Sequence, residues 1–233
     1  MIPFLIYMFI KKHQKQYWSK NALKIRKLLN HILPILYIGL LILALSLIPK
    51  LSKSQVLQIN YKIMKGADNI GWLKLEKNME GNRSSFVLTS EVKTRIIFLI
   101  NVSSKETAIF ENGQLLFSSQ FRKANGSTKL NKQTKLVGDK YEIVENGGKE
   151  SLDHSFIGIN LLSLYFREPK DIDQVYSDNH ECFIKIIKTN DGGYKVKLPD
   201  GNSNCYYYKD GICTKIKIEH TFYSANIILS STN

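Results

Sequence analysis

Acidic side chains are missing from the first quarter of this 233-residue sequence. Residues 1–55 contain nine Lys or Arg and no Asp or Glu, which gives this part a net charge of +9. Residues 56–233 contain 24 basic and 20 acidic side chains, a net charge of only +4. Most of the overall charge of +13 is therefore concentrated at the N-terminus. The remainder does not form the basic face that nucleic-acid binding requires, so no nucleic-acid partner is expected.

Cysteine is also scarce, with three residues in the whole chain. An odd number leaves at least one cysteine unpaired, which excludes a small disulfide-stapled scaffold. Cys205 and Cys213 flank an Asp-Gly turn at residues 210–211. A two-residue turn there places Cys205 opposite Ile216 and on the other face of the hairpin from Cys213. We therefore expect no disulfide between them.

Several motifs that carry chemistry are lacking. No C-x2-4-C knuckle is present, so the histidines and cysteines of the last third are not expected to bind zinc. No calcium-loop spacing is present, so the acidic residues 168–181 are interpreted as a solvated loop. Asp153, His154 and Ser155 are sequence neighbours without a G-x-S-x-G elbow, and neighbours cannot converge on one substrate atom. No catalytic residue, cofactor or metal is predicted. The residues weighed as metal ligands are His180, Cys182, Cys205, Cys213 and His220 for zinc, and Glu168, Asp171, Asp173, Asp178 and Glu181 for calcium.

A long apolar run follows the basic N-terminus. Residues 32–48 carry no charge, and twelve of these seventeen residues are Leu or Ile. As a helix the run is roughly 26 Å long, close to the thickness of a bilayer core. Seven Lys or Arg precede it within residues 1–31, and only Lys50 and Lys53 follow closely. The positive-inside rule then keeps the N-terminus in the cytoplasm and places residues 50–233 outside, in a single-pass membrane protein.

A cleaved signal is the alternative interpretation of the same run. Residues 44–46 (Ala-Leu-Ser) offer a small-x-small cleavage pattern, and cleavage near Ser46 would release a periplasmic or secreted protein. No cysteine lies near the run, which excludes a lipid-attached lipoprotein. Met8 could serve as an alternative start. The predicted organisation is a cytoplasmic n-region (1–31), a transmembrane helix or signal core (32–48), a linker (49–55) and an exported β domain (56–233).

Turn signals divide the exported part into short alternating segments. Asn-Gly and Asp-Gly pairs recur, as at residues 112–113, 125–126 and 210–211, and supply the positive φ angles of tight hairpins. Between them apolar and polar residues alternate, as in residues 57–63 and 194–198. This pattern predicts an all-β fold, an antiparallel meander of twelve or thirteen strands.

Two segments break the alternation. Residues 96–102 (IIFLINV) are apolar on both faces, which predicts a strand covered on both sides. Residues 156–166 (FIGINLLSLYF) are apolar nearly all round, which predicts a buried helix. The simplest architecture is a barrel or curved half-barrel with this short helix in its concavity. The weak candidates for lining a cleft between helix and sheet are Phe156, Leu161, Leu164 and Tyr165.

A family resemblance rests on turn and core residues of the exported part. They are Tyr61-x4-Gly66-x4-Gly71, the turn at residues 109–113, Leu164-Tyr165-Phe166-x2-Pro169, and the closing hairpins from Tyr194 to Gly211. In these residues the chain resembles a family of uncharacterised bacterial cell-envelope proteins, known only as a domain of unknown function. The plan is also similar, at the level of fold alone, to the open barrels with a helical plug of lipoprotein carriers.

Two functions follow as hypotheses. The first is a non-enzymatic envelope module that holds a lipid or other apolar ligand between the curved sheet and the helix. The second is a structural or interaction protein with a solid barrel that docks an envelope partner. A cavity above ~300 Å³ lined by residues 156–166 would favour the first hypothesis, and its absence would favour the second. An enzyme of unrecognised type is a weaker third hypothesis.

Overall fold

The computed structural model describes residues 55–95, 99–152, 154–221 and 223–232, together with Met8 and Lys11. The chain divides into two compact units, Met1–Leu51 and Ser52–Asn233, and the sheet described below belongs to the second. The predicted n-region, apolar run and linker lie outside the described residues, apart from Met8, Lys11 and Gln55. In the part of the chain that is described, no helix is long and apolar enough to cross a membrane.

The second unit is built on one antiparallel sheet of fourteen strands, counted over the described residues. Their bounds are β1 Gln55–Lys65, β2 Asp68–Glu80, β3 Arg83–Arg95, β4 Leu99–Glu111, β5 Gln114–Ala124, β6 Ser127–Val137, β7 Lys140–Glu145, β8 Gly148–Leu152, β9 Gln174–Ser177, β10 Cys182–Lys188, β11 Tyr194–Lys197, β12 Ser203–Lys209, β13 Ile212–His220 and β14 Tyr223–Thr232. The all-β, antiparallel prediction is confirmed. The strand count is slightly higher than predicted, because short strands such as β8, which is exposed at four of five positions, carry no alternation.

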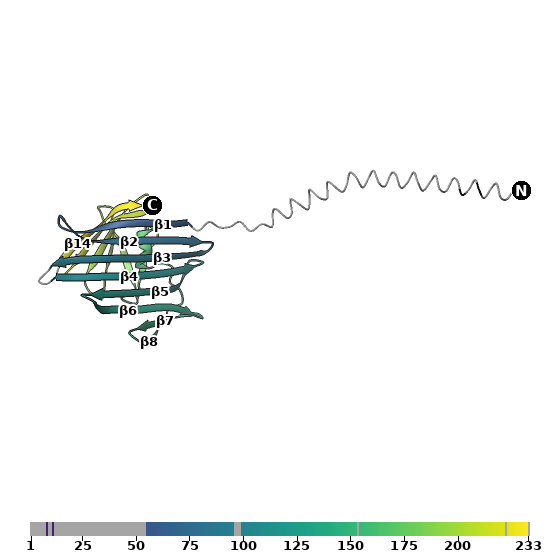
Figure 1. The fold of residues 1–233 in the computed structure, drawn as a ribbon, viewed down its shortest axis with the longest axis horizontal. Coiled ribbons are helices and arrows are strands. Elements are labelled where there is room, and N and C mark those ends of the chain that lie inside the picture. Colours follow the sequence, from purple (N-terminus) through teal and green to yellow (C-terminus); the bar gives the residue numbers. More distant parts are fainter. Residues whose placement is uncertain are drawn as a thin grey trace. The chain divides into compact units, whose positions relative to one another are not determined.

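Two meanders make up the sheet. Strands β1–β8 pair consecutively, strands β9–β14 pair consecutively, and β1 pairs with β14 to join the two sets (Figure 1). The predicted turns have the expected conformations, with φ near +50° at Asn112, Asn125 and Asp210, each followed by a glycine that also has positive φ. Hairpins therefore account for nearly every connection within each meander.

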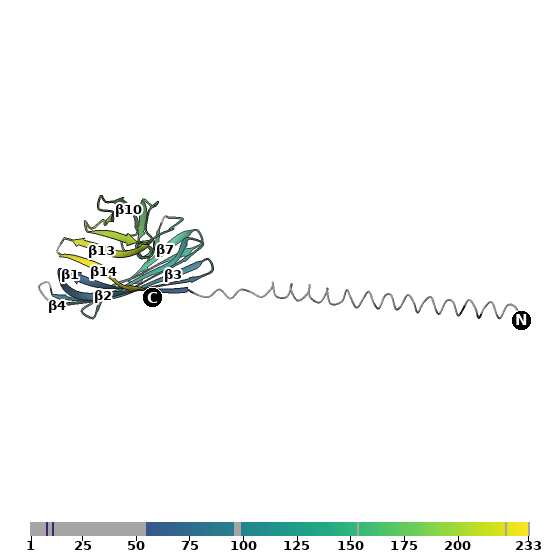
Figure 2. The same cartoon turned by 90° about the horizontal axis from the view of Figure 1, so that it is seen from above.

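The sheet is strongly curved and does not close. Figure 2 shows the strands near its two ends, β7 and β10, rising on the same side of the central strands. The end strands β8 and β9 each have a single neighbour in the sheet, β7 and β10. The sequence predicted either a closed barrel or a curved half-barrel. The closed barrel is therefore wrong, and the observed sheet is curved and open.

The connection from β8 to β9 crosses the concave face, but it is not the predicted helix. Only Leu161–Tyr165 (η1) is helical, as a 3-10 turn capped by Asn160. Residues before the cap are extended: the Ile157 carbonyl accepts a hydrogen bond from Leu115 N in β5, and the Ile159 carbonyl accepts one from Tyr176 N in β9. The segment lacks alternation because it is enclosed on both sides, and an enclosed extended chain is as uniformly apolar as a buried helix.

Residues 99–102 also differ from the prediction made for residues 96–102. Residues 96–98 lie outside the described residues, and Leu99 begins β4 with 66 % of its surface exposed. The neighbouring Asn101 is exposed as well. Over residues 99–102 the sheet is therefore not covered on both sides, and these residues form the start of β4 rather than the centre of a strand.

The inner face of the sheet changes character along one cross-strand row. The row begins with directly opposed Ile59, Leu75 and Leu88 on β1–β3, all buried in the hydrophobic core. It continues through polar side chains on β4–β7, which are, in register, Glu106, Gln120, Lys132 and Glu145. The concave face thus has an apolar half and a polar half.

Candidate functional site

The four side chains predicted to line a cleft have different environments. Leu164 is fully buried and Tyr165 is 9 % exposed, whereas Leu161 is half-buried and Phe156 is 56 % exposed. The Tyr165 ring meets the rings of Tyr61 and Tyr206 edge-on, at 5.7 and 6.4 Å between centroids. Leu164 and Tyr165 therefore act as core residues that fix the segment to the sheet.

A pocket of about 200 Å³ does open between the sheet and this segment. Its walls include immediate neighbours of the predicted residues rather than those residues themselves. The lining residues are Lys77, Met79, Ser84, Phe86, Phe110, Gly113, Gly158, Ile159, Ser163, Phe166 and Arg167. We call this space the sheet–segment pocket. The alternation of β2–β4 places the strand residues of this set on the concave face.

Three phenylalanines form the apolar wall of the sheet–segment pocket. The Phe86 ring meets Phe110 edge-on at 5.9 Å between centroids and lies tilted against Phe166 at 5.2 Å. Phe86 and Phe110 are buried, and Phe166 is half-buried. Because the rings come from β3, β4 and the end of η1, the wall exists only when the segment is seated on the sheet.

Two cations border the same pocket. Lys77 follows Leu73 and Leu75 on the inner face of β2, and its Nζ lies 5.8 Å from the Phe86 ring centroid and 5.9 Å from that of Phe166. Burial lowers the pKa of the Lys77 amine. Arg167 follows the aromatic wall and is exposed. The pocket therefore combines an apolar interior with positive charge, the composition that suits an amphipathic ligand.

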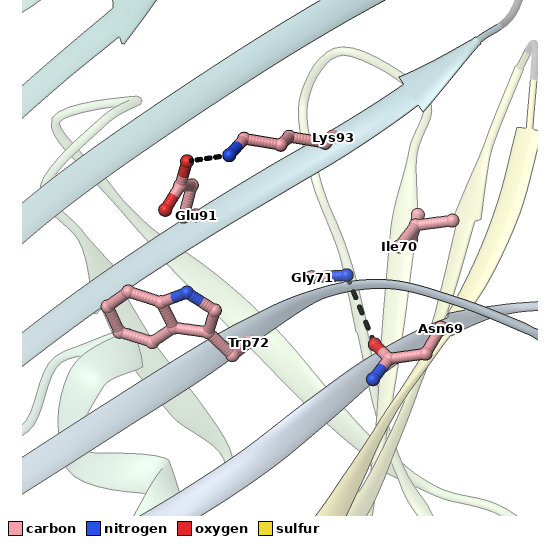
Figure 3. A pocket seen from close by; sticks show the side chains of 6 residues that line it. All are labelled: Asn69, Ile70, Gly71, Trp72, Glu91 and Lys93. Atoms are coloured by element: carbon pink, nitrogen blue, oxygen red, sulfur yellow. Dashed lines mark hydrogen bonds and ion pairs between the residues drawn. The ribbon is translucent and has the colours of Figure 1, made fainter.

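Two other hollows lie elsewhere on the sheet. One of about 310 Å³ surrounds Trp72 near the start of β2 (Figure 3). There Lys93 pairs with Glu91 at 3.0 Å, and Asn69 Oδ1 accepts a hydrogen bond from Gly71 N. Gly71 must be glycine, since a Cβ would lie 2.2 Å from the Glu91 carbonyl oxygen. The two charged side chains and the Asn69 side chain of this hollow already bond to other residues of its lining, which makes it a weaker binding site.

The second hollow, of about 350 Å³, lies over β11–β13 and includes Lys195, Ser203 and Glu219. Lys195 and Glu219 are paired there, because Lys195 Nζ and Ser203 Oγ both donate to Glu219 Oε2, at 3.0 and 2.8 Å, and Lys197 is a third charged residue of the lining. The lining is largely polar, with His220 as its one ring-bearing side chain. Of these three hollows, only the sheet–segment pocket offers a wall of phenylalanines beside unpaired charge.

A buried polar cluster lies on the other half of the concave face. Asp178, which is 7 % exposed, accepts hydrogen bonds from Ser118 Oγ at 2.5 Å and from Asn160 Nδ2 at 2.9 Å. Asn160 in turn accepts from the backbone N and the hydroxyl of Ser163. Burial raises the pKa of Asp178, and the bonds from Ser118 and Asn160 offset part of that rise. The cluster ties the segment to β5 and to the end of β9.

Lys132 extends this cluster across β6. Its Nζ donates to Glu181 at 2.5 Å, to Glu145 at 2.9 Å and to the Asn179 carbonyl at 3.3 Å. Burial would lower the pKa of Lys132, but its bonds to Glu181 and Glu145 outweigh burial and raise it. The acidic residues 168–181 were expected to be solvated, and for Asp178 and Glu181 this is wrong. Asp178 is buried, and Glu181 forms an ion pair with an interior lysine.

In the part of the chain that the structure describes, three side-chain polar atoms are buried without a hydrogen-bond partner: Gln120 Oε1, Thr134 Oγ1 and Tyr176 Oη. Such atoms raise the free energy of the folded state unless a buried water molecule forms a hydrogen bond with them. Glu106, opposite Gln120, has its pKa raised by burial, an effect that Arg122, 4.0 Å away, partly opposes. The sequence signal that could have predicted this buried polar cluster was the recurrence of polar residues at the inward positions of β5 and β6.

The three cysteines are all free. A β-bulge between Tyr207 and Tyr208 shifts the register, so Cys205 faces Lys217 instead of the predicted Ile216. Cys213 is fully buried, whereas Cys205 lies on the outer face beside Tyr207 and Gly193. The prediction that the two thiols lie on opposite faces is confirmed. Among the described residues no group of three or more His, Cys, Asp or Glu is placed to hold a metal ion.

Comparison with known proteins identifies a family without an assigned activity. The family model described as "Domain of unknown function (DUF6134)" matches residues 61–230, which include every motif on which the resemblance was based. No curated protein matches the sequence. The assignment to a family of unknown function is thereby confirmed, while the envelope location and the likeness to lipoprotein carriers stay predictions.

Proposed function

We propose, from the premise that this chain belongs to the family described as Domain of unknown function (DUF6134), that it is a non-enzymatic ligand-binding module of the cell envelope. Residues 32–48 anchor it in the membrane, with residues 50–233 outside; cleavage near Ser46 is the alternative. The ligand is apolar or amphipathic and lies between the curved sheet and residues 156–166. The observation that supports this role is the wall formed by Phe86, Phe110 and Phe166.

The size of the sheet–segment pocket limits the ligand. Its volume of about 200 Å³ is below the ~300 Å³ typical of drug-sized sites, which was the limit expected for the first hypothesis, so for a ligand of that size the pocket favours the second candidate below. A dry cavity of roughly 150 Å³ is known to accept benzene. The proposed ligand, or the part of it that enters the pocket, is therefore about the size of one ring or a short alkyl chain, and not a whole membrane lipid.

A filling substitution tests this proposal. Ser84 lines the pocket from the inner face of β3, and Ser85, the next residue, points to the outer face. We expect purified full-length protein to bind a neutral ring such as indole in a saturation-transfer NMR experiment. Ser84→Phe should abolish the signal, and the matched control Ser85→Phe should keep it. If the Ser84→Phe variant binds indole as well as wild type does, the proposed site is wrong.

The second candidate is an interaction protein whose concavity is filled. Ile157 and Leu164 are fully buried, so the segment itself occupies most of the space beneath the sheet. In the described residues β8 pairs only with β7, which leaves one strand edge open to a partner. If this role is correct, neither wild type nor Ser84→Phe binds indole, and Ser151→Pro in β8 abolishes partner association. Ser151 forms a non-hydrogen-bonded pair with Glu142 of β7, so its N–H is one of the donors of the open edge.

A further inference from the structure

We propose, resting on the ligand-binding role above, that the ligand carries an anionic group and that Lys77 and Arg167 hold this group beside the aromatic wall of the sheet–segment pocket. The ligand class is thus a carboxylate or phosphate on an apolar stem of ring size. This assignment names the chemistry of the ligand, which the aromatic wall alone does not determine.

The pairing of charges on β2 is the first argument. Lys74, on the outer face, forms an ion pair with Glu76 at 2.7 Å. Lys77, on the inner face of the same strand, has no carboxylate partner among the described residues, and neither has Arg167. The nearest acidic residue in sequence to Arg167 is Glu168, which accepts from Tyr194 Oη and pairs with Lys170. Two cations without counter-ions therefore meet at one pocket.

The cost of placing Lys77 there is the second argument. A lysine that is partly removed from water and is not paired raises the free energy of the folded protein. The two phenylalanine rings offset part of this cost, since a cation near an aromatic face gains about 0.5–1 kcal/mol. A leucine would pack at this inner position without such a cost, as Leu73 and Leu75 do on the same strand. An anionic ligand supplies the counter-charge that the protein lacks.

The third argument is geometric. Phe166 and Arg167 are consecutive residues at the end of η1, so the segment brings an aromatic wall and a cation together. Lys77 comes from the sheet, and its amine lies near the same Phe166 ring. A ligand that spans from the rings to the two cations would therefore contact both the sheet and the segment. Arginine and lysine both form charge-assisted hydrogen bonds with carboxylate and phosphate oxygens.

A pair of nearly isosteric probes tests the charge requirement. Phenylacetate and phenylacetamide share a ring and differ in charge, and each is titrated into the purified full-length chain by ligand-observed NMR. We expect phenylacetate to bind at least tenfold more tightly. Benzyl phosphate, measured in the same way, distinguishes a preference for phosphate from one for carboxylate. Bound anion should also raise the pKa of Lys77 from its lowered value, measured by the NMR shift of its Nζ or Cε.

Variants with matched controls locate the effect. Lys77→Gln should remove the preference for phenylacetate, Lys77→Arg should retain it, and Arg167→Gln should weaken phenylacetate binding several-fold. The control Lys74→Gln removes a cation from the outer face of the same strand and should change neither affinity. Lys77→Arg keeps the charge and so remains informative if Lys77→Gln fails to fold.

The two proposals fail in different ways. Equal binding of phenylacetate and phenylacetamide by wild type would overturn the anionic ligand and leave the ligand-binding role intact. Binding of neither probe, together with no indole binding, would overturn both. A preference for phenylacetate that persists in Lys77→Gln and Arg167→Gln would place the anion elsewhere and refute the assignment of these residues.

Discussion

Leu164 is one of two fully buried hydrophobic side chains of the segment 156–166, and its truncation measures how tightly the segment packs beneath the sheet. Leu164 has no exposed surface, and its backbone carbonyl accepts a hydrogen bond from Tyr208 Oη at 2.7 Å. Leu164→Ala removes the side chain and leaves this backbone bond in place. The change in the free energy of unfolding therefore reports burial and the cavity left behind, without a change in hydrogen bonding.

The size of the effect follows from that burial. Truncation of a fully enclosed leucine costs about 2–5 kcal/mol, and with rigid sheet on one side we expect the middle of that range, about 3–4 kcal/mol. For a domain of this size roughly 2–4 °C of melting temperature corresponds to 1 kcal/mol, so Tm should fall by roughly 6–16 °C. Circular dichroism during heating and urea titration both measure this change. Phe156→Ala, at a residue 56 % exposed, is the control and should cost less than about 1 kcal/mol. A Leu164→Ala protein that melts with wild type would refute the packed segment.

Three further outcomes are expected. Burial raises the pKa of Glu106, so between the ordinary glutamate pKa and this raised value the folded state keeps a proton that the unfolded state releases. The free energy of unfolding of wild type, measured by urea titration, should therefore increase as the pH falls through this window. Glu106→Gln should not show this increase. Tyr208→Phe leaves the Leu164 carbonyl without its donor and should cost about 1–2 kcal/mol by the same titrations, and an unchanged stability would show that water replaces the hydroxyl. A reporter that is active only outside the cytoplasm, fused after Asn233, should be active, and neutralising the seven basic residues before position 32 should weaken or invert that result.

The fold was predictable where a sequence pattern has a single physical cause. Strict alternation arises from a strand with one buried face, and Asn-Gly or Asp-Gly pairs favour the positive φ angles of a tight turn, so together they identify hairpins. The helix predicted over residues 156–166 was wrong, since uniform apolarity follows from enclosure and not from helical geometry. Asn160, the cap of η1, was the one sequence signal that the helical turn begins only there.

The site was predicted only in part. The segment that contributes to the pocket was predicted, but none of the four residues chosen lines it. Leu164 and Tyr165 face the core, and Phe156 is largely exposed, because the face that an extended chain presents depends on its partners. Lys77 was not predicted as a site residue, because the sequence contains many lysines and only the alternation along β2 shows that this one points inward. Asp178 was placed in a solvated loop, because composition alone does not reveal that Ser118, 60 positions earlier, meets its carboxylate.

The two ends of the sheet differ in a way that limits self-association. At β9 the outer backbone is already used, because Tyr176 N donates to the Ile159 carbonyl and Asn160 forms a parallel bridge with Tyr176. At β8 no such cover exists in the described residues. A fibre requires two open ends on each molecule, so that one copy can recruit the next without limit. With one end covered, edge pairing between copies can join β8 only to β8, and growth stops at a two-fold dimer.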